Sequence, residues 1–141
     1  MQYELKIESS GESIEIVEEN MITSAEIMFD TINNDTKAKS NAILARLTIC
    51  GKIYSGKDGD ITDKMVKISN WSRDLNEETT YRNVNFTVKN NNGAELRTYE
   101  IPDMFVCDYK EIYKSDGNND TTIFELKLTQ SANKLSEIKT Y

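Results

Sequence analysis

The run Gly51-Lys-Ile-Tyr-Ser-Gly-Lys57 has the clearest potential for chemistry, because it matches the G-x-x-x-x-G-K pattern of a phosphate-binding loop. In such a loop, backbone N–H groups and the lysine hold nucleotide phosphates, and a following Ser or Thr binds Mg²⁺. Here the next residue is Asp58, whose carboxylate repels phosphate, and Gly59 stands where a helix should begin. A nucleotide-binding enzyme that uses Gly51–Lys57 is therefore kept only as an alternative.

A second candidate site is the run Asp116-Gly-Asn-Asn-Asp120, which places oxygen ligands at the first, third and fifth positions of a calcium-binding loop. Thr121 then replaces the turn glycine, and Lys127 replaces the bidentate Glu. We therefore expect a tight polar turn between two strands. A turn and a helix cap likewise account for three earlier aspartates without a metal ion: Asp58, Asp60 and Asp63.

The chain contains no histidine, which removes the commonest general base, the commonest metal ligand and every Ser–His or Cys–His pair. Adjacent carboxylates such as Glu18-Glu19 and Glu77-Glu78 would point to opposite faces of a strand and could not share a site there. The sequence therefore predicts a protein that is not an enzyme, with no catalytic residue, no metal site and no cofactor.

The net charge limits which partners are expected, and the N-terminal residues and the cysteines indicate the compartment. A formal net charge of -7 repels nucleic-acid phosphates and anionic lipids over about 8 Å at physiological salt, so neither is an expected partner. Met1 to Glu8 alternates apolar and polar residues, which predicts no signal peptide and cytoplasmic synthesis. Cys50 and Cys107 lie in apolar surroundings and are expected to be buried free thiols, with a disulfide as the alternative.

The elements that must position these residues are mostly strands. Apolar and polar residues alternate with period two in several segments, which is typical of strands with one wet face. Pro102 is expected to separate two strands, because proline cannot sit inside a central ladder. Residues 21–32 suit a strand or a helix, and we favour a strand. The expected strands centre on residues 3–7, 14–16, 43–53, 84–88, 96–101, 105–109 and 124–128.

One helix is expected around residues 62–73. Thr62 can cap a helix that starts at Asp63, and Met65, Ile68 and Trp71 then share one face. Trp71 is most simply a core anchor, and an exposed interface role is the alternative.

Together these elements predict a mainly β fold: one domain over residues 1–141, built as an antiparallel β-barrel or sandwich of seven or eight strands. Residues 33–41 are polar and turn-forming, which predicts a mobile loop. Residues 132–141 could form a short helix or a loose tail.

Four segments of the second half resemble small proteins of phage-like gene clusters: Tyr81-Arg-Asn-Val84, Tyr99-Glu-Ile-Pro-Asp103, Phe105-Val-Cys-Asp-Tyr109 and Phe124-Glu-Leu-Lys-Leu128. These proteins in turn resemble the tube proteins of contractile injection systems, namely phage tail tubes and the Hcp proteins of type VI secretion. The resemblance covers roughly the last 80 residues, with a weaker match over the first 50. It implies a single-helix β-barrel that stacks as rings, usually hexameric, to line a tube, with no active site.

The resemblance implies that the partners are further copies of the chain, together with sheath and baseplate proteins in a phage tail-like particle. The candidate interface residues are then those of the polar loop, with Trp71 added: Asn33, Asn34, Asp35, Thr36, Lys37, Lys39, Ser40 and Asn41. A monomeric acidic module of regulatory or immunity type, which would bind a basic protein, remains a second alternative.

Overall fold

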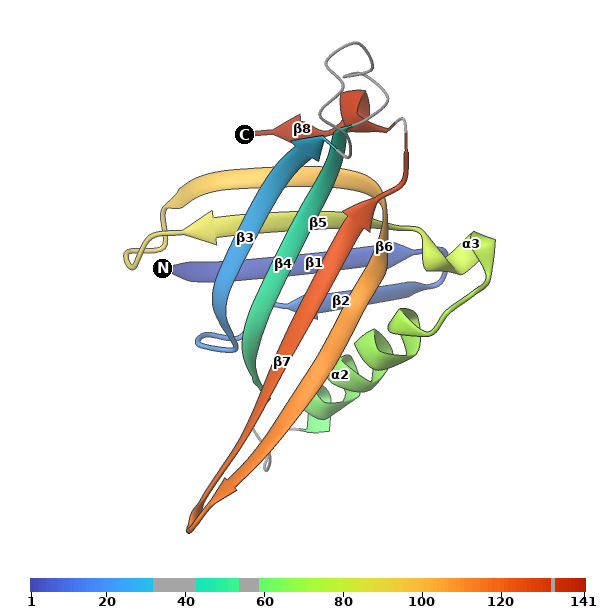
Figure 1. Ribbon diagram of the computed structural model, residues 1–141. Coiled ribbons are helices and arrows are strands. Elements are labelled where there is room, and N and C mark those ends of the chain that lie inside the picture. Colours follow the sequence, from blue (N-terminus) through green and yellow to red (C-terminus); the bar gives the residue numbers. More distant parts are fainter. Residues whose placement is uncertain (32–42, 54–58, 133) are drawn as a thin grey trace.

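The computed structural model describes residues 1–31, 43–53, 59–132 and 134–141 (Figure 1). In these residues the chain forms eight strands, two α-helices and one short 3₁₀ helix, which agrees with the expected mainly β fold. The strands are β1 (Gln2–Ser9), β2 (Glu12–Ile16), β3 (Ile22–Thr31), β4 (Ile43–Ile53), β5 (Arg82–Lys89), β6 (Glu95–Asp116), β7 (Asn119–Gln130) and β8 (Lys139–Thr140). The helices are α2 (Gly59–Ser72), α3 (Glu77–Thr80) and the 3₁₀ helix η2 (Leu135–Glu137).

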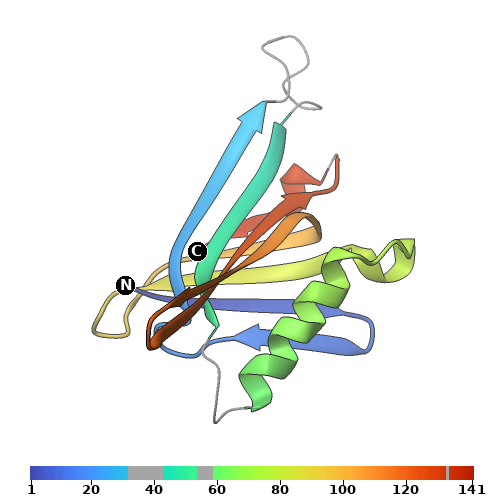
Figure 2. The ribbon, with the colours of Figure 1, turned by 60° about the horizontal axis from the view of Figure 1, so that its bottom comes forward.

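All eight strands belong to one antiparallel sheet with the order β2-β1-β5-β6-β7-β4-β3, and β8 pairs with β6. The sheet folds over at β6, so that it makes two layers whose strands cross (Figures 1 and 2). We call β2, β1, β5 and the first half of β6 the first layer, and the second half of β6 with β7, β4 and β3 the second layer. The segment 21–32 is thus a strand at one edge, as favoured.

Pro102 does not separate two strands, so that expectation was wrong. Strand β6 runs without interruption from Glu95 to Asp116 and pairs first with β5 and then with β7. Pro102 and Asp103 together oppose the single residue Asn83, because the register steps from Val84↔Ile101 to Arg82↔Met104. Asp103 has a φ of 56°. Proline is tolerated at such a β-bulge, where the ladder requires no N–H from it.

The core lies between the two layers, and α2 closes one side of it (Figure 2). Met65, Ile68 and Trp71 are all buried, as their spacing of three predicts, and α2 contacts β2, β4 and β6. The helix begins at Gly59, earlier than the expected start at Asp63. The apolar face thus identified the helix, but the choice of Thr62 as the cap placed its start too late in the sequence.

Trp71 is 1% exposed and acts as the core anchor; the exposed-interface alternative does not apply to this buried side chain. Its Nε1–H donates to the carbonyl of Thr80 at 2.7 Å. The guanidinium of Arg82 lies 5.1 Å from the centre of the indole ring. Arg82 also donates to Glu12 at 3.0 Å and to the carbonyl of Thr79 at 3.0 Å. One buried arginine therefore ties α2, α3 and β2 together.

The C-terminal segment is tied to the first layer. It forms the short helix η2 and then β8, whose residues Lys139 and Thr140 pair with Glu100 and Tyr99 of β6. Tyr141 continues the pairing, since its backbone exchanges hydrogen bonds of 2.9 and 3.0 Å with Thr98. Of the two expected forms, the short helix is present, and a strand follows it.

Candidate assembly surface

The structure accounts for the first part of the phosphate-loop pattern without a ligand. Gly51 lies inside β4, where an added Cβ would come within 2.2 Å of the carbonyl oxygen of Met21 and 2.6 Å of Cε1 of Phe124. Glycine is thus required there by packing. Residues 54–58 lie outside the described part of the chain, and α2 does begin at Gly59, so the argument against a helix start there was wrong. Strand β4 is antiparallel to both of its neighbours, which still disfavours a nucleotide-binding fold.

The calcium-loop pattern forms the expected turn. Asp116 pairs with Asn119 across the end of the β6–β7 hairpin, and Gly117 has a φ of 62°. The Ser115 hydroxyl donates to Asp120 at 3.0 Å, so this carboxylate is used within the hairpin. Among the described residues, no group of three or more His, Cys, Asp or Glu side chains could hold a metal ion. None of the described helices is long and apolar enough to cross a membrane.

The two cysteines are free, but they are not both buried as expected. Cys50 is partly buried, while Cys107 is exposed. Cys107 is the extra residue of a β-bulge, because Val106 pairs with Leu128 and Asp108 pairs with Lys127. The Thr129 hydroxyl lies 3.3 Å from its sulfur. The apolar sequence around Cys107 could not reveal the bulge that turns its side chain outward.

Of the candidate interface residues from the sequence, those at positions 33–41 lie outside the described part of the chain, between β3 and β4. The described residues offer a different surface, the two open edges of the second layer. One edge is β3, and the other is the part of β6 beyond Met104, where pairing with β5 has ended. Unpaired strand edges are templates for pairing with another chain. The run Tyr109-Lys-Glu-Ile-Tyr-Lys114 does not alternate apolar with polar residues, so there was no clear sequence signal for the second edge.

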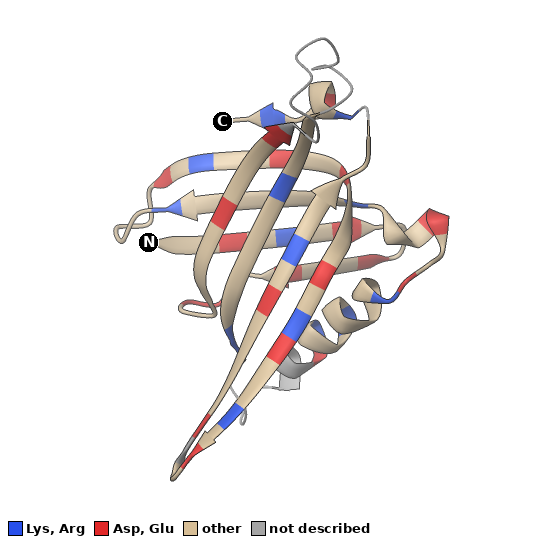
Figure 3. Cartoon of the chain, in the orientation of Figure 1, with Lys and Arg blue, Asp and Glu red and all other residues tan. Residues whose placement is uncertain are grey.

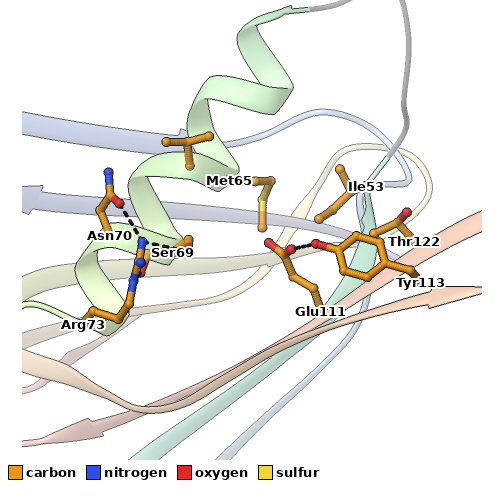
Figure 4. A pocket seen from close by; sticks show the side chains of 9 residues that line it. Ile53, Met65, Ser69, Asn70, Arg73, Glu111, Tyr113 and Thr122 are labelled. Atoms are coloured by element: carbon orange, nitrogen blue, oxygen red, sulfur yellow. Dashed lines mark hydrogen bonds between the residues drawn. The ribbon is translucent and has the colours of Figure 1, made fainter.

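A groove of about 470 Å³ lies beside the β6 edge, between α2 and the β6–β7 hairpin (Figure 4). Helix α2 supplies Val66, which is 52% exposed, and β6 supplies Tyr113, which is 71% exposed. Polar groups sit at its margins. The side chains that line the groove are Ile53, Met65, Val66, Ser69, Asn70, Arg73, Glu111, Tyr113 and Thr122.

The polar groups of the groove are fixed in place. The Glu111 carboxylate accepts hydrogen bonds from the hydroxyls of Tyr109, at 2.5 Å, and Tyr113. Burial and this hydrogen bond raise the pKa of Tyr109, and the hydrogen bond to Glu111 raises the pKa of Tyr113. Arg73 donates to Asn70 at 2.9 Å and to the carbonyl of Ser69 at 3.2 Å. The groove therefore presents apolar side chains beside polar groups that hydrogen bonds within the chain hold in place.

Charged residues of both signs lie along the strands of the second layer (Figure 3). Glu125 pairs with Lys127 at 3.2 Å and with Lys110 at 3.7 Å, and the hydrogen bond to Glu125 raises the pKa of Lys127. A hollow of about 560 Å³ on this face is lined mainly by polar side chains from three strands and includes the exposed Met28. This face is suited to contact with water. The two strand edges beside it, in contrast, carry backbone N–H and C=O groups that no neighbouring strand among the described residues pairs with.

Comparison of the sequence with known proteins found no match, whereas comparison of the structure did. No protein-family model matches the sequence, and no curated protein matches it. Solved structures do align with the chain along nearly its whole length. A chain of the PVC sheath–tube complex, an extracellular contractile injection system, has a TM-score of 0.57 at 15% identity and covers 99% of this chain and 88% of that chain.

Hcp1 from Flavobacterium johnsoniae has a TM-score of 0.55 at 10% identity and covers 100% of this chain and 98% of that chain. A chain of the anti-feeding prophage baseplate has a TM-score of 0.53 at 14% identity, with coverage of 99% and 92%. At such low identities, these alignments show a likeness of fold. At that level they confirm the resemblance found in residues 81–130. The chain therefore has the Hcp-like fold, which it shares with tube and baseplate components of contractile injection systems.

Proposed function

We propose that this protein is a structural subunit that assembles with copies of itself into rings, hexameric by analogy, and that the rings form the tube of a phage tail-like contractile injection particle. The observation that carries the proposal is the likeness of 99–100% of the chain to components of such assemblies. Sheath and baseplate proteins are the further partners that follow from this role.

The second layer supports the proposal, because its open edges lie at opposite ends of one four-stranded unit, on β3 and on β6. Two different surfaces of one chain can join head to tail, and such a contact closes into a ring when the rotation between copies permits. Pairing the edges would also satisfy backbone groups that are otherwise left to water. The polar segment 33–41, which follows β3 in the sequence, remains a proposed arm toward a neighbouring copy.

Nothing in the described residues suggests that catalysis accompanies this role. The pattern at Gly51 has a packing explanation, and the pattern at Asp116 forms a turn. Calorimetry with ATP and Mg²⁺ tests the nucleotide-binding alternative directly, and we expect no heat of binding at millimolar nucleotide.

The test of the assembly role is the particle size of the purified protein over a concentration series, measured by light scattering and electron microscopy, alone and with its sheath and baseplate partners. Rings or stacked rings support the proposal. A strictly monomeric particle under all of these conditions contradicts it. A salt-sensitive one-to-one complex with a basic protein, without self-assembly, would instead support the acidic binding module.

A further inference from the structure

We propose that the edge strand β3 of one copy pairs with the open half of β6 in the next copy, antiparallel, with Met28 opposite Ile112. This register deepens the assembly role proposed above and rests on it. It assigns a specific partner to each side chain of residues 26–30 on β3, and it can be wrong while the assembly role is right.

The strand directions allow this joint. Within the second layer each strand is antiparallel to its neighbour, so β3 runs opposite to β6 across the four strands. A copy related by rotation about an axis that runs roughly along these strands keeps them in nearly the same sense. Its β3 therefore arrives antiparallel to β6 of the first copy, and the alternation of the sheet continues across the contact.

The side chains that face outward on the two edges are fixed by pairing within the sheet. Glu111 pairs with buried Phe124, so the neighbouring residues 110 and 112 point outward. Phe29 pairs with buried Ala45, so residues 28 and 30 point outward in the same way. A shift by one residue would reverse the faces, so only registers that differ by two residues compete.

With Met28 opposite Ile112, an apolar pair meets at the centre of the contact. These side chains are 41% and 38% exposed, an unusual state for apolar residues in the middle of strands. Opposite charges flank them on both sides: Lys110 faces Asp30, and Lys114 faces Glu26. Directly opposed charges of opposite sign stabilise a strand pair. Glu26, Asp30 and Lys114 form no ion pair within the part of the chain that the structure describes.

Both competing registers oppose like charges. A shift by two residues in one direction sets Asp108 against Asp30, and a shift in the other direction sets Asp116 against Glu26. Like charges directly opposite each other destabilise a strand pair. The sequence of the two edges therefore selects one register by attraction and rejects its neighbours by repulsion.

The stagger of this register is also that of a closed sheet. Within one copy, the row of Met28 crosses Arg46 and Thr129 and reaches Phe105 on β6. In the proposed contact, Met28 of the next copy lies opposite Ile112 and not opposite Phe105. Each copy is therefore shifted along the strand direction by about six residues, because the extra residue Cys107 of the bulge is not counted. Over four strands this gives a strand tilt of about 45°, at the upper end of the range for closed barrels.

The inward side chains of β3 then enter the groove beside β6. In this register Ile27 lies opposite Tyr113, and Phe29 lies opposite Glu111, whose carboxylate is already held by two phenols. Phe29 is 47% exposed and is the largest apolar side chain on that edge; one side of its ring already contacts Tyr99 of its own chain, with 6.1 Å between the ring centres. It would pack toward the exposed Val66 of α2 and so fill the apolar part of the groove.

Disulfide trapping measures the register. In a Cys50→Ser, Cys107→Ser background, Met28→Cys with Ile112→Cys should give covalent ladders of subunits under mild oxidation, since directly opposite Cβ atoms lie within reach of a disulfide. Glu26→Cys or Asp30→Cys with Ile112→Cys are the controls, displaced by two residues each way. We expect them to cross-link at least about fivefold more slowly. Faster cross-linking of either control overturns the register.

Charge reversal tests the same contact without cysteines. Glu26→Lys and Lys114→Glu should each lower the apparent association constant by about tenfold, and mixing the two variants, or combining them in one chain, should restore it. Glu15→Lys on the edge strand β2 and Lys67→Glu on α2 are matched controls that should change it by less than about twofold. Loss of association without rescue in the mixture overturns the register.

The outcomes separate this inference from the assembly role. If the unmodified chain forms rings in the electron microscope but the designed pair does not cross-link, the register fails and the assembly role stands. If the unmodified chain forms no assembly alone or with its sheath and baseplate partners, the assembly role fails and the register fails with it.

Discussion

The ring of Phe124 packs on the bare backbone of Gly51, with its Cε1 atom 2.6 Å from the position that a Cβ on Gly51 would occupy. The carbonyl oxygen of Met21 lies still closer to that position, at 2.2 Å. At Gly51, therefore, the backbone of β4 is in close contact with both β7 and the segment before β3. A glycine that looks like the first residue of a phosphate loop is explained by this close approach.

Gly51→Ala should destabilise the fold by about 1–3 kcal/mol, because the added methyl group must displace a backbone carbonyl as well as an aromatic ring. Urea unfolding followed by the fluorescence of Trp71, the sole tryptophan, measures the free energy of unfolding. Adding Phe124→Leu to Gly51→Ala should recover little, since it leaves the clash with Met21. An unchanged unfolding free energy in Gly51→Ala would show that the strands can separate there at no cost.

The periodicity of apolar residues correctly predicted the strands and the helix in which one face is buried. Alternation identified strands such as Val84–Val88, and a spacing of three placed Met65, Ile68 and Trp71 on one buried helix face. These predictions hold because burial of one face imposes its period on the sequence.

The wrong predictions about Pro102 and Cys107 both depended on a partner strand. Pro102 is compatible with a strand only because β5 offers one residue where β6 has two, and Cys107 turns outward because β7 imposes a second bulge. The candidate edges were hidden for the same reason. Whether β3 and the second half of β6 lie at an edge depends on the strand order of the whole sheet, which a single sequence does not state.

Arg82→Lys should destabilise the protein by about 1–3 kcal/mol, although it keeps the charge. A lysine ammonium cannot donate both to Glu12 and to the Thr79 carbonyl while it covers the Trp71 ring, as the planar guanidinium does. The same unfolding measurement checks this. Arg97→Lys, at an exposed position on β6, is the matched control and should change the stability by less than about 0.5 kcal/mol. Equal effects of the two variants would contradict the role assigned to Arg82.

Removal of residues 135–141 should lower the free energy of unfolding by about 1–2 kcal/mol and expose one edge of β6. The truncation deletes the backbone pairing of Thr98 with Tyr141 and the packing of Ile138 on the core. Hydrogen exchange should then show loss of protection at the Thr98 amide, with protection in β4 and β7 retained. A truncated chain with unchanged exchange at Thr98 would mean that the C-terminal strand does not pair in solution.

The stability of the loop between α2 and α3 should depend on pH through Asp74. Hydrogen bonds from the Thr79 hydroxyl and the Asn76 backbone, with the nearby charge of Arg82, hold the pKa of Asp74 below its ordinary value of 3.8. A lowered pKa in the folded state means that the charged form favours folding. Its contribution is complete above about pH 4 and is lost as the pH falls through the folded-state pKa.

Asp74→Asn should therefore lower the stability at pH 7 and reduce the loss of stability between about pH 4 and pH 2. Thermal unfolding at a series of pH values measures both effects. Glu15→Gln, exposed on β2, serves as the control and should keep the acid sensitivity of the unmodified chain, because no folded-state contact of that side chain is at stake. If Asp74→Asn and the unmodified chain lose stability in parallel below pH 4, another carboxylate governs the acid transition, and the Asp74–Thr79 bond is too weak to link protonation to folding.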